Sequence, residues 1–233
     1  MDSTDDFLQI GGHENTFELI GLNKIRKLTN QKEAEFYEAL QKLDSLKSLL
    51  QFTPKYFSML QFQSTGKNDF YVTLENVIEP FKKPNLLDLK LGKQLYDDDA
   101  DEIKKQRMIE KASRTTSGSL GLRIAGMKYF DGETYDKEFG RQLSSQQFQA
   151  ELLKFLKPLK AEILRNTEAL ISAIKLVEGK FISASVLIVY ESDNPLKYTF
   201  KLIDFAHTSI GEGMGSHKDI LESLAKLAEI ISE

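Results

Sequence analysis

The sequence contains no cysteine, which excludes disulfides, thiolate metal sites and cysteine nucleophiles. It also lacks any apolar run as long as the roughly 18 residues that a membrane span needs, so we expect no membrane insertion. The opening segment, MDSTDDFLQIGGHENTF, has no apolar region of the kind found in secretory signals. These absences predict an intracellular protein, in the cytoplasm, the nucleus or both.

Several common catalytic motifs are absent as well. The sequence has no GxxxxGK(S/T) phosphate-binding loop, no HRD catalytic loop of protein kinases, no HExxH and no GxSxG. Their absence argues against P-loop nucleotidases, zinc peptidases and α/β-hydrolases. Positive charge is not in excess either, because Lys+Arg 31 against Asp+Glu 35 gives a net charge of -4. This balance argues against a nucleic-acid partner but permits a local basic pocket.

The residues that are present predict a globular α+β protein. Hydrophobic residues make up 41% of the 233 residues, enough to bury a core in one large domain or two tightly joined lobes. Residues 75–85 carry two prolines and little periodicity, so we interpret them as the linker between lobes. Asn30 and Glu33 form a capping box, and Ser216 with Asp219 is the expected cap of a terminal helix. Hydrophobic periodicity predicts strands at 17–27, 56–62, 70–74, 86–91, 119–130, 181–191 and 197–205, and helices at 31–48, 99–113, 144–157 and 159–177.

The segment PNLLDLKLG at 84–92 is the first candidate for chemistry. On a strand, Asp88 and Lys90 face one side and the leucines between them face the core. One interpretation is a surface ion pair, which contributes only about 0–1 kcal/mol. In the other, the lysine neutralises a transferring phosphoryl group and the aspartate contacts a ribose hydroxyl or a metal-linked water.

The segment LIDFAH at 202–207 ends an apolar strand with Asp204. A lone carboxylate there carries a burial cost unless something pairs with it. Magnesium is a natural partner, because it favours one or two carboxylates together with phosphate oxygens and water. The alternative is that Asp204 caps a turn and His207 is an ordinary polar loop residue.

A basic helix and a strand lysine complete the candidates. Lys104, Arg107 and Lys111 recur at i, i+3 and i+7, so they share one helix face. That face is either a solvated charged surface or a site for a polyanion. Lys27 precedes Glu33 of the next predicted helix, and protein-kinase-like folds use such a pair to hold the α- and β-phosphates of ATP.

Together these segments resemble the inositol polyphosphate kinase family. PNLLDLKLG matches the family signature PxxxDxKxG, and IDFAH at 203–207 matches its second signature intact. Between them, TTSGSLGLRIAGMK at 115–128, DKEFGRQL at 136–143 and SASVLIVYE at 183–191 are similar to family segments in the same order. The resemblance covers nearly the whole chain.

The resemblance implies a two-lobed, protein-kinase-like fold. Residues 1–76 would form an N-lobe, an antiparallel sheet with a helix, that binds the nucleotide phosphates. Residues 77–233 would form a larger C-lobe that carries the magnesium, catalytic and inositol-phosphate sites. The implied activity is transfer of the γ-phosphoryl group of ATP to an inositol polyphosphate, with Mg as cofactor, by a monomer.

The resemblance also assigns roles to individual residues. Lys90, Asp88 and Asp204 would be catalytic, with Asp204 holding the metal and Asp88 contacting the ribose. The remaining assignments are Lys27 and Glu33 at the nucleotide phosphates, Glu75 and Val77 at the adenine through their backbone, and Lys90, Lys104, Arg107, Lys111 and His207 at the inositol phosphate.

Two questions stay open at the level of the sequence. GKQLYD resembles the multikinases, whereas GGH, FTPKY and DDDAD resemble the hexakisphosphate kinases. The substrate is therefore inositol hexakisphosphate, a lower inositol phosphate such as the trisphosphate, or both. The alternative to a kinase is a non-catalytic inositol-phosphate-binding scaffold that retains the fold.

Overall fold

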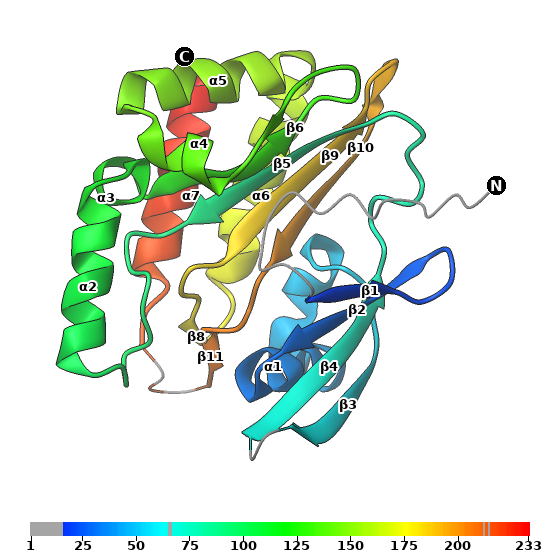
Figure 1. Ribbon diagram of the computed structural model, residues 1–233, viewed down its shortest axis with the longest axis vertical. Coiled ribbons are helices and arrows are strands. Elements are labelled where there is room, and N and C mark those ends of the chain that lie inside the picture. Colours follow the sequence, from blue (N-terminus) through cyan, green and yellow to red (C-terminus); the bar gives the residue numbers. More distant parts are fainter. Residues whose placement is uncertain (1–15, 65–66, 212, 214) are drawn as a thin grey trace.

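The protein folds into two lobes that differ in size (Figure 1). The computed structural model describes residues 16–64, 67–211, 213 and 215–233. The GGH segment at 11–13 therefore lies outside the described residues. The predicted lobe boundary at 76/77 falls between the last strand of the smaller lobe and the first strand of the larger one, and it stays a prediction.

The smaller lobe is an antiparallel sheet in the order β1-β2-β4-β3, accompanied by helix α1 and the 3₁₀ helix η1. Its elements are β1 (Phe17–Leu19), β2 (Lys24–Thr29), α1 (Gln31–Lys42), η1 (Asp44–Phe52), β3 (Tyr56–Ser64) and β4 (Lys67–Glu75). The strand predicted at 17–27 is in fact a hairpin, because the chain turns at Gly21, whose φ of +69° favours glycine.

Helix α1 begins where the sequence predicted but ends earlier. The Asn30 side chain accepts a hydrogen bond from the Glu33 N–H at 3.1 Å, which caps the helix start. Phe36, Tyr37 and Leu40 on one face are buried, as the periodicity predicted. The helix stops at Lys42 because the next residue is extended, and the chain continues as η1.

The larger lobe contains a five-stranded antiparallel sheet in the order β10-β9-β5-β6-β7 and a two-stranded sheet of β8 and β11. The strands are β5 (Pro84–Leu91), β6 (Leu122–Lys128), β7 (Thr134–Tyr135), β8 (Gly179–Lys180), β9 (Ser185–Glu191), β10 (Asn194–Ile203) and β11 (Ser209–Ile210). The helices are α2 (Glu102–Ser113), α3 (Thr116–Leu120), α4 (Lys137–Gln142), α5 (Ser145–Leu156), η2 (Lys157–Leu159), α6 (Lys160–Ile174) and α7 (Lys218–Ser232).

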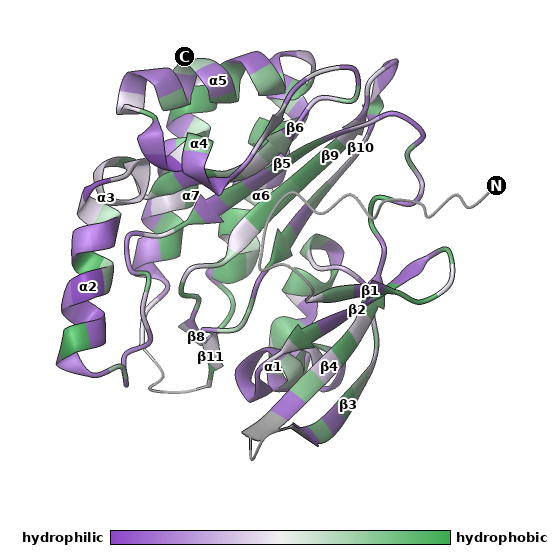
Figure 2. Cartoon of the chain, viewed as in Figure 1, coloured by the Kyte–Doolittle hydropathy of each residue, from purple (hydrophilic) through white to green (hydrophobic). Residues whose placement is uncertain are grey.

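The hydrophobic core is one cluster that runs from α1, η1 and β4 of the smaller lobe to the large sheet and the helices behind it. Leu87, Leu89 and Leu91 of β5 are fully buried in it, as the alternation predicted. Figure 2 shows hydrophobic residues along the strands of this sheet, whereas α2 is largely hydrophilic. In α2 only Ala112 is buried, so this helix lies at the surface. No helix among the described residues combines the length and the apolar character needed to cross a membrane.

The expected cap of the terminal helix is confirmed only for Ser216, whose hydroxyl accepts the Lys218 N–H at 3.2 Å where the helix begins. Helix α7 follows His217, which makes no capping hydrogen bond through its side chain. The Asp219 carboxylate instead accepts the backbone N–H groups of Lys93 and Gln94 at 2.9 Å. These contacts anchor the turn that follows β5, so Asp219 acts on the loop after the PNLLDLKLG strand.

Candidate active site

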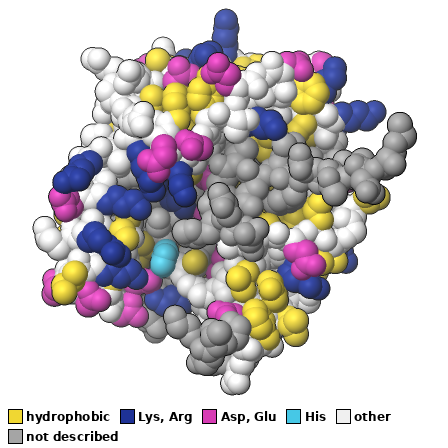
Figure 3. Space-filling model, viewed as in Figure 1, with side chains coloured by type: hydrophobic (Ala, Val, Ile, Leu, Met, Phe, Trp, Pro, Cys, Tyr) yellow, Lys and Arg dark blue, Asp and Glu magenta, His cyan; other side chains and the backbone are white. Residues whose placement is uncertain are grey.

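A pocket of about 730 Å³ opens between the two lobes. Residues of β2 and the start of α1 line it on one side, and residues of β5, β6, α2 and α4 line it on the other. Figure 3 shows Lys and Arg side chains gathered on this face, next to a histidine. The volume is within the range of about 300–1,000 Å³ that small-molecule sites occupy.

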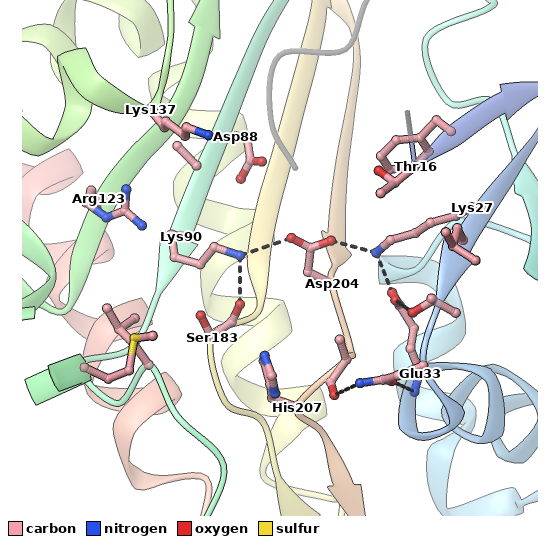
Figure 4. A pocket seen from close by; sticks show the side chains of 18 of the residues that line it. Thr16, Lys27, Glu33, Asp88, Lys90, Arg123, Lys137, Ser183, Asp204 and His207 are labelled. Carbon is pink, nitrogen blue, oxygen red and sulfur yellow. Dashed lines mark hydrogen bonds and ion pairs between the residues drawn. The ribbon is translucent and has the colours of Figure 1, made fainter. Parts of the chain in front are cut away.

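Asp204 is the centre of the charged groups in the pocket (Figure 4). Its Oδ1 lies 2.8 Å from the Lys27 Nζ, and its Oδ2 lies 3.0 Å from the Lys90 Nζ. Lys27 belongs to the smaller lobe and Lys90 to the larger one. The carboxylate at the end of β10 therefore joins two cations that the fold brings from separate lobes.

Glu33 fixes the position of Lys27. Its Oε1 lies 2.8 Å from the Lys27 Nζ and accepts the Phe205 N–H at 3.1 Å, while its Oε2 accepts the Thr29 hydroxyl. Burial alone lowers the pKa of Lys27, but the charges of Asp204 and Glu33 raise it well above its usual value. Burial opposes ionisation of Asp204, yet Lys27 and Lys90 hold its pKa far below the usual value. Lys27 and Asp204 are therefore both charged at neutral pH.

Two residues of this network adopt left-handed backbone conformations. Asp204 has a φ of 66° and Ser183 a φ of 55°, values that cost non-glycine residues about 1–3 kcal/mol each. They flank the paired ends of β10 and β9. In this conformation both present an oxygen to Lys90, whose Nζ donates to the Ser183 carbonyl at 2.9 Å and to Asp204. The backbone strain thus serves to place the Lys90 ammonium.

Asp88 lies in the same pocket but does not pair with Lys90 as a surface ion pair. Its carboxylate is buried, and Oδ1 has no hydrogen-bond partner among the described residues. Burial raises the pKa of Asp88, and nearby Asp204 adds to the increase although Lys90 opposes it. A buried acceptor without a donor has a free-energy cost, which a ligand hydroxyl would remove.

His207 is held at the pocket by a residue that the sequence did not single out. Its Nδ1 lies 2.7 Å from one oxygen of Asp97, and Lys32 of α1 lies 2.9 Å from the other. Burial opposes ionisation of Asp97, but its bonds with Lys32 and His207 lower its pKa. Asp97 is the first of several aspartates in the acidic stretch before α2. The sequence could not single it out, because only its contacts with Lys32 and His207 in the folded protein distinguish it from the other aspartates.

Only one of the three cations predicted on the basic helix lies at the pocket. Lys111 lines the pocket, whereas Lys104 and Arg107 of the same helix are not among the residues that line it. Arg123 of β6 and two residues of α4, Lys137 and Arg141, line it instead. The segment DKEFGRQL, which forms α4, was recognised in the sequence as similar to a family segment. No role was assigned to its lysine and arginine.

The predicted hinge residues lie outside the described pocket. Glu75 ends β4, and its backbone N–H donates to the Lys55 carbonyl at 2.8 Å. Val77 is buried two residues further on. Neither residue lines the pocket, so their proposed contacts with adenine stay predictions.

The Asp204 carboxylate is suited to bind a divalent cation whose other ligands are phosphate oxygens. Among the described residues there is no cluster of three or more histidine, aspartate or glutamate side chains that could hold a metal by itself. Asp204 keeps 28% of its side chain exposed, and each carboxylate oxygen has a second lone pair beyond the one that faces a lysine. Magnesium commonly binds through one or two carboxylates and completes its coordination with phosphate oxygens and water.

Comparison with known proteins decides the family. Residues 71–232 match the sequence profile of the family described as inositol polyphosphate kinase. The chain belongs to this family. It has the two-lobed, protein-kinase-like fold that the sequence predicted. Among solved structures, the inositol phosphate multikinase of S. cerevisiae in complex with ADP and Mn²⁺ superposes with a TM-score of 0.75 and 28% identity, covering 90% of this chain and 98% of that one.

Curated inositol phosphate kinases are similar over part of their length. Inositol hexakisphosphate kinase 3 of Mus musculus is 36% identical over 180 residues, which are 65% of this chain and 46% of that protein. Inositol polyphosphate multikinase of Schizosaccharomyces pombe is 32% identical over 180 residues, 69% of this chain and 66% of that protein. The chain spans about half the length of the hexakisphosphate kinases it matches.

Proposed function

We propose that this chain is a kinase that transfers the γ-phosphoryl group of ATP to an inositol polyphosphate, with magnesium as the divalent ion. The observation that carries the proposal is the Asp204 carboxylate between Lys27 and Lys90 in the pocket. Family membership supports the reaction, and the multikinase structure with ADP and Mn²⁺ supports the use of a nucleotide and a divalent cation.

In this proposal the protein positions and neutralises charged groups. Lys27, fixed by Glu33, binds nucleotide phosphates, and Lys90 neutralises the charge on the phosphoryl group during transfer. Asp204 would hold the magnesium ion, which supplies further neutralisation of phosphate charge. An acceptor oxygen forms a bond to the γ-phosphorus in line as the bond to the ADP oxygen breaks. Asp88 and water are both candidates to receive the acceptor proton.

Both substrate classes remain in the proposal. The similarity to hexakisphosphate kinase 3 favours inositol hexakisphosphate, and the similarity to the multikinases favours lower inositol phosphates. The alternative is a non-catalytic scaffold that binds inositol phosphates. Retention of Lys27, Lys90 and Asp204 in one network of ion pairs favours the kinase, because a scaffold has no need of all three. The monomeric state and the cytoplasmic or nuclear location stay predictions from the sequence.

The test is a panel of inositol phosphates incubated with ATP and magnesium, with products separated by charge. The kinase proposal expects a product with one more phosphate, absent when a chelator removes magnesium. Asp204→Asn should reduce single-turnover transfer by at least about 100-fold, as loss of transition-state charge stabilisation does. Asp193→Asn is the matched control, because Asp193 pairs with Lys83 at the surface, outside the pocket.

The outcomes separate the two functions. Binding of an inositol phosphate without any phosphorylated product would support the scaffold. Full turnover by folded Asp204→Asn protein would remove Asp204 from the metal role.

A further inference from the structure

One aspartate of the acidic stretch before α2 is turned into the protein. Of the three consecutive aspartates at 97–99, Asp97 has 16% of its side chain exposed, whereas Asp98 has 62% and Asp99 77%. The Asp97 Oδ1 lies 2.9 Å from the Lys32 Nζ, and its Oδ2 lies 2.7 Å from the His207 Nδ1. Each carboxylate oxygen therefore has its own partner, one from each lobe. We call Lys32, Asp97 and His207 the Asp97 bridge.

The bridge differs from the ordinary contact that the next aspartate makes. Asp98 pairs with Lys180 at 2.7 Å, stays largely exposed and does not line the pocket. Such a pair contributes only about 0–1 kcal/mol to stability. In the bridge, by contrast, His207 lines the pocket, whereas Asp97 and Lys32 are not among the described residues that line it. Asp97 and Lys32 would therefore affect a bound ligand through His207.

The bridge determines which nitrogen of His207 carries the hydrogen when the ring is neutral. Burial opposes ionisation of Asp97, but its bonds with Lys32 and His207 hold its pKa below the usual value. An ionised carboxylate has no hydrogen to donate, so the 2.7 Å contact requires a hydrogen on the His207 Nδ1. In a neutral imidazole, a hydrogen on Nδ1 leaves Nε2 with a lone pair.

The Nε2 atom of His207 is available to a ligand. It makes no hydrogen bond with any residue that the structure describes, and 36% of the side chain is exposed. Because the two nitrogens lie on different edges of the ring, a ring that turns Nδ1 to Asp97 turns Nε2 away from it. Figure 4 shows His207 among the side chains that line the pocket. In this tautomer the ring offers a ligand in the pocket a hydrogen-bond acceptor.

An acceptor at this place distinguishes between the two substrate classes. A free ring hydroxyl, as in inositol trisphosphate, can donate a hydrogen bond to the lone pair. Inositol hexakisphosphate has a phosphate on every ring carbon and no hydroxyl, and an ionised phosphate oxygen is repelled by the lone pair. The opposite tautomer, with its hydrogen on Nε2, would instead donate a charge-assisted hydrogen bond to the phosphate.

We propose that Asp97 is a positioning residue that fixes the tautomer of His207 and thereby favours inositol phosphates with a free hydroxyl over the fully phosphorylated ring. This inference rests on the proposed function, from which it takes the class of substrate. Lys32 completes the arrangement, because its ammonium occupies the other carboxylate oxygen and fixes the orientation of the Asp97 side chain.

The decisive variant is Asp97→Asn, which keeps the shape of the side chain. The Lys32 ammonium can only donate, so it holds the amide oxygen, and the amide NH₂ then faces the His207 Nδ1. Nδ1 must accept that hydrogen bond, which moves the ring hydrogen to Nε2. Asp98→Asn is the matched control, because it removes the same charge from an adjacent side chain that is bonded to Lys180 instead of His207.

Removal of Lys32 provides a rescue. In Lys32→Met the Asp97 carboxylate still accepts the Nδ1 hydrogen, so the tautomer should not change. In the double variant Lys32→Met/Asp97→Asn the amide is free to rotate, its oxygen can accept from Nδ1, and the original tautomer should return. A purely structural role of Asp97 gives no reason for this recovery, since the double variant lacks the whole ion pair with Lys32.

Nitrogen-15 NMR of the histidine side chains shows the tautomer directly at about pH 8.5, above the range in which an ordinary histidine titrates. The chain has three histidines, and His207→Gln identifies the signals of His207. We expect the hydrogen on Nε2 in Asp97→Asn, and on Nδ1 in the wild type, Asp98→Asn, Lys32→Met and the double variant. A hydrogen on Nε2 in the wild type, or an unchanged ring in folded Asp97→Asn protein, would overturn the proposal.

Calorimetric titration of the two inositol phosphates into nucleotide-free protein at the same pH measures the preference. Asp97→Asn should bind inositol hexakisphosphate about 10-fold more tightly or better, since a charge-assisted hydrogen bond replaces a repulsive contact. Binding of inositol trisphosphate should change little, because a hydroxyl can donate to one tautomer and accept from the other. Asp98→Asn and the double variant should keep the preference of the wild type.

The same titration in a His207→Gln background separates the tautomer from the field of the removed charge. Without the imidazole, Asp97→Asn should no longer strengthen binding of the hexakisphosphate. If the gain persists in that background, the lost negative charge explains it and the proposal fails.

These measurements do not depend on phosphoryl transfer, so the two proposals can fail separately. If the wild type phosphorylates no inositol phosphate but the tautomer and the binding preference respond as expected, the kinase proposal fails and Asp97 keeps its role in binding. If the wild type is an active kinase and Asp97→Asn alters neither the tautomer nor the preference, the Asp97 proposal fails and the kinase proposal stands.

Discussion

Lys27 and Asp204 are 177 residues apart in the chain, yet the Lys27 Nζ lies 2.8 Å from the Asp204 carboxylate. The contact crosses from the sheet of the smaller lobe to the strand end of the larger lobe. Phe36 of α1 stacks on Phe205 with ring centroids 4.0 Å apart, so apolar packing holds the same junction together. The geometry of the site therefore depends on how the lobes pack against each other.

The Lys27–Glu33 pair should contribute measurably to stability. Lys27→Met, Glu33→Gln and the double variant form a cycle, and we expect a coupling energy of about 1–3 kcal/mol. The expectation follows from burial, because the two side chains are only 14% and 1% exposed. Arg26, the neighbour of Lys27 on β2, and Glu18 of β1 supply the control cycle, since their pair is 35% and 60% exposed and should couple by less than about 1 kcal/mol. Denaturant unfolding measures both, and equal couplings would contradict the role of burial.

Lys90→Met should slow phosphoryl transfer without weakening ATP binding. We expect kcat and kcat/KM to fall together, by roughly 100-fold or more, because the ammonium stabilises charge that develops in the transition state. Steady-state kinetics with varied ATP provides the measurement, and Lys157→Met controls for loss of a lysine outside the pocket. A higher KM for ATP with unchanged kcat would show instead that Lys90 binds the nucleotide in the ground state.

Gly140→Ala should destabilise the protein by more than about 2 kcal/mol, in the range of overpacked core positions. The added Cβ would lie 1.8 Å from the backbone oxygen of Ile124, which cannot move aside as a flexible side chain does. Gln142→Ala in the same helix is exposed and should change stability by no more than about 0.5 kcal/mol. Thermal unfolding compares the two, and similar stabilities would mean that α4 can move away from β6 at little cost.

Acid should destabilise the protein through His217. Its Nε2 donates to the Val177 carbonyl at 2.8 Å, while Nδ1 is buried with no partner among the described residues. Burial lowers the pKa of His217, although the bond to Val177 opposes the shift. Below about pH 6.5, where an ordinary histidine titrates, the unfolded chain binds a proton that the folded chain does not, so the free energy of unfolding decreases as the pH is lowered.

The test is the pH dependence of unfolding in the wild type and in His217→Gln. The slope for the wild type should exceed that of the variant by up to about 1.4 kcal/mol per pH unit between pH 6.5 and the folded-state pKa. Parallel slopes would show that the His217 proton does not affect stability.

Local sequence determined many of the elements. The cap at Asn30, the alternating leucines of β5 and the apolar strand before Asp204 were predicted because each depends on periodicity or on a neighbour a few residues away. The predicted ends of two elements were wrong, because a turn or an extended residue interrupts the pattern there. The chain turns at Gly21 within a predicted strand, and α1 ends at Lys42 instead of continuing to residue 48.

The family and the set of Lys27, Asp88, Lys90 and Asp204 could be predicted from the amino-acid sequence, because the motifs that carry them are short and contiguous. The partners of these side chains, in contrast, follow from the tertiary fold. It placed Lys90 against Asp204 and not Asp88, brought Asp97 to His207, and brought cations of α2, β6 and α4 to one pocket. Ion pairs and pockets depend on distances between segments far apart in the chain, and those distances are fixed by packing of the core, which no local pattern contains.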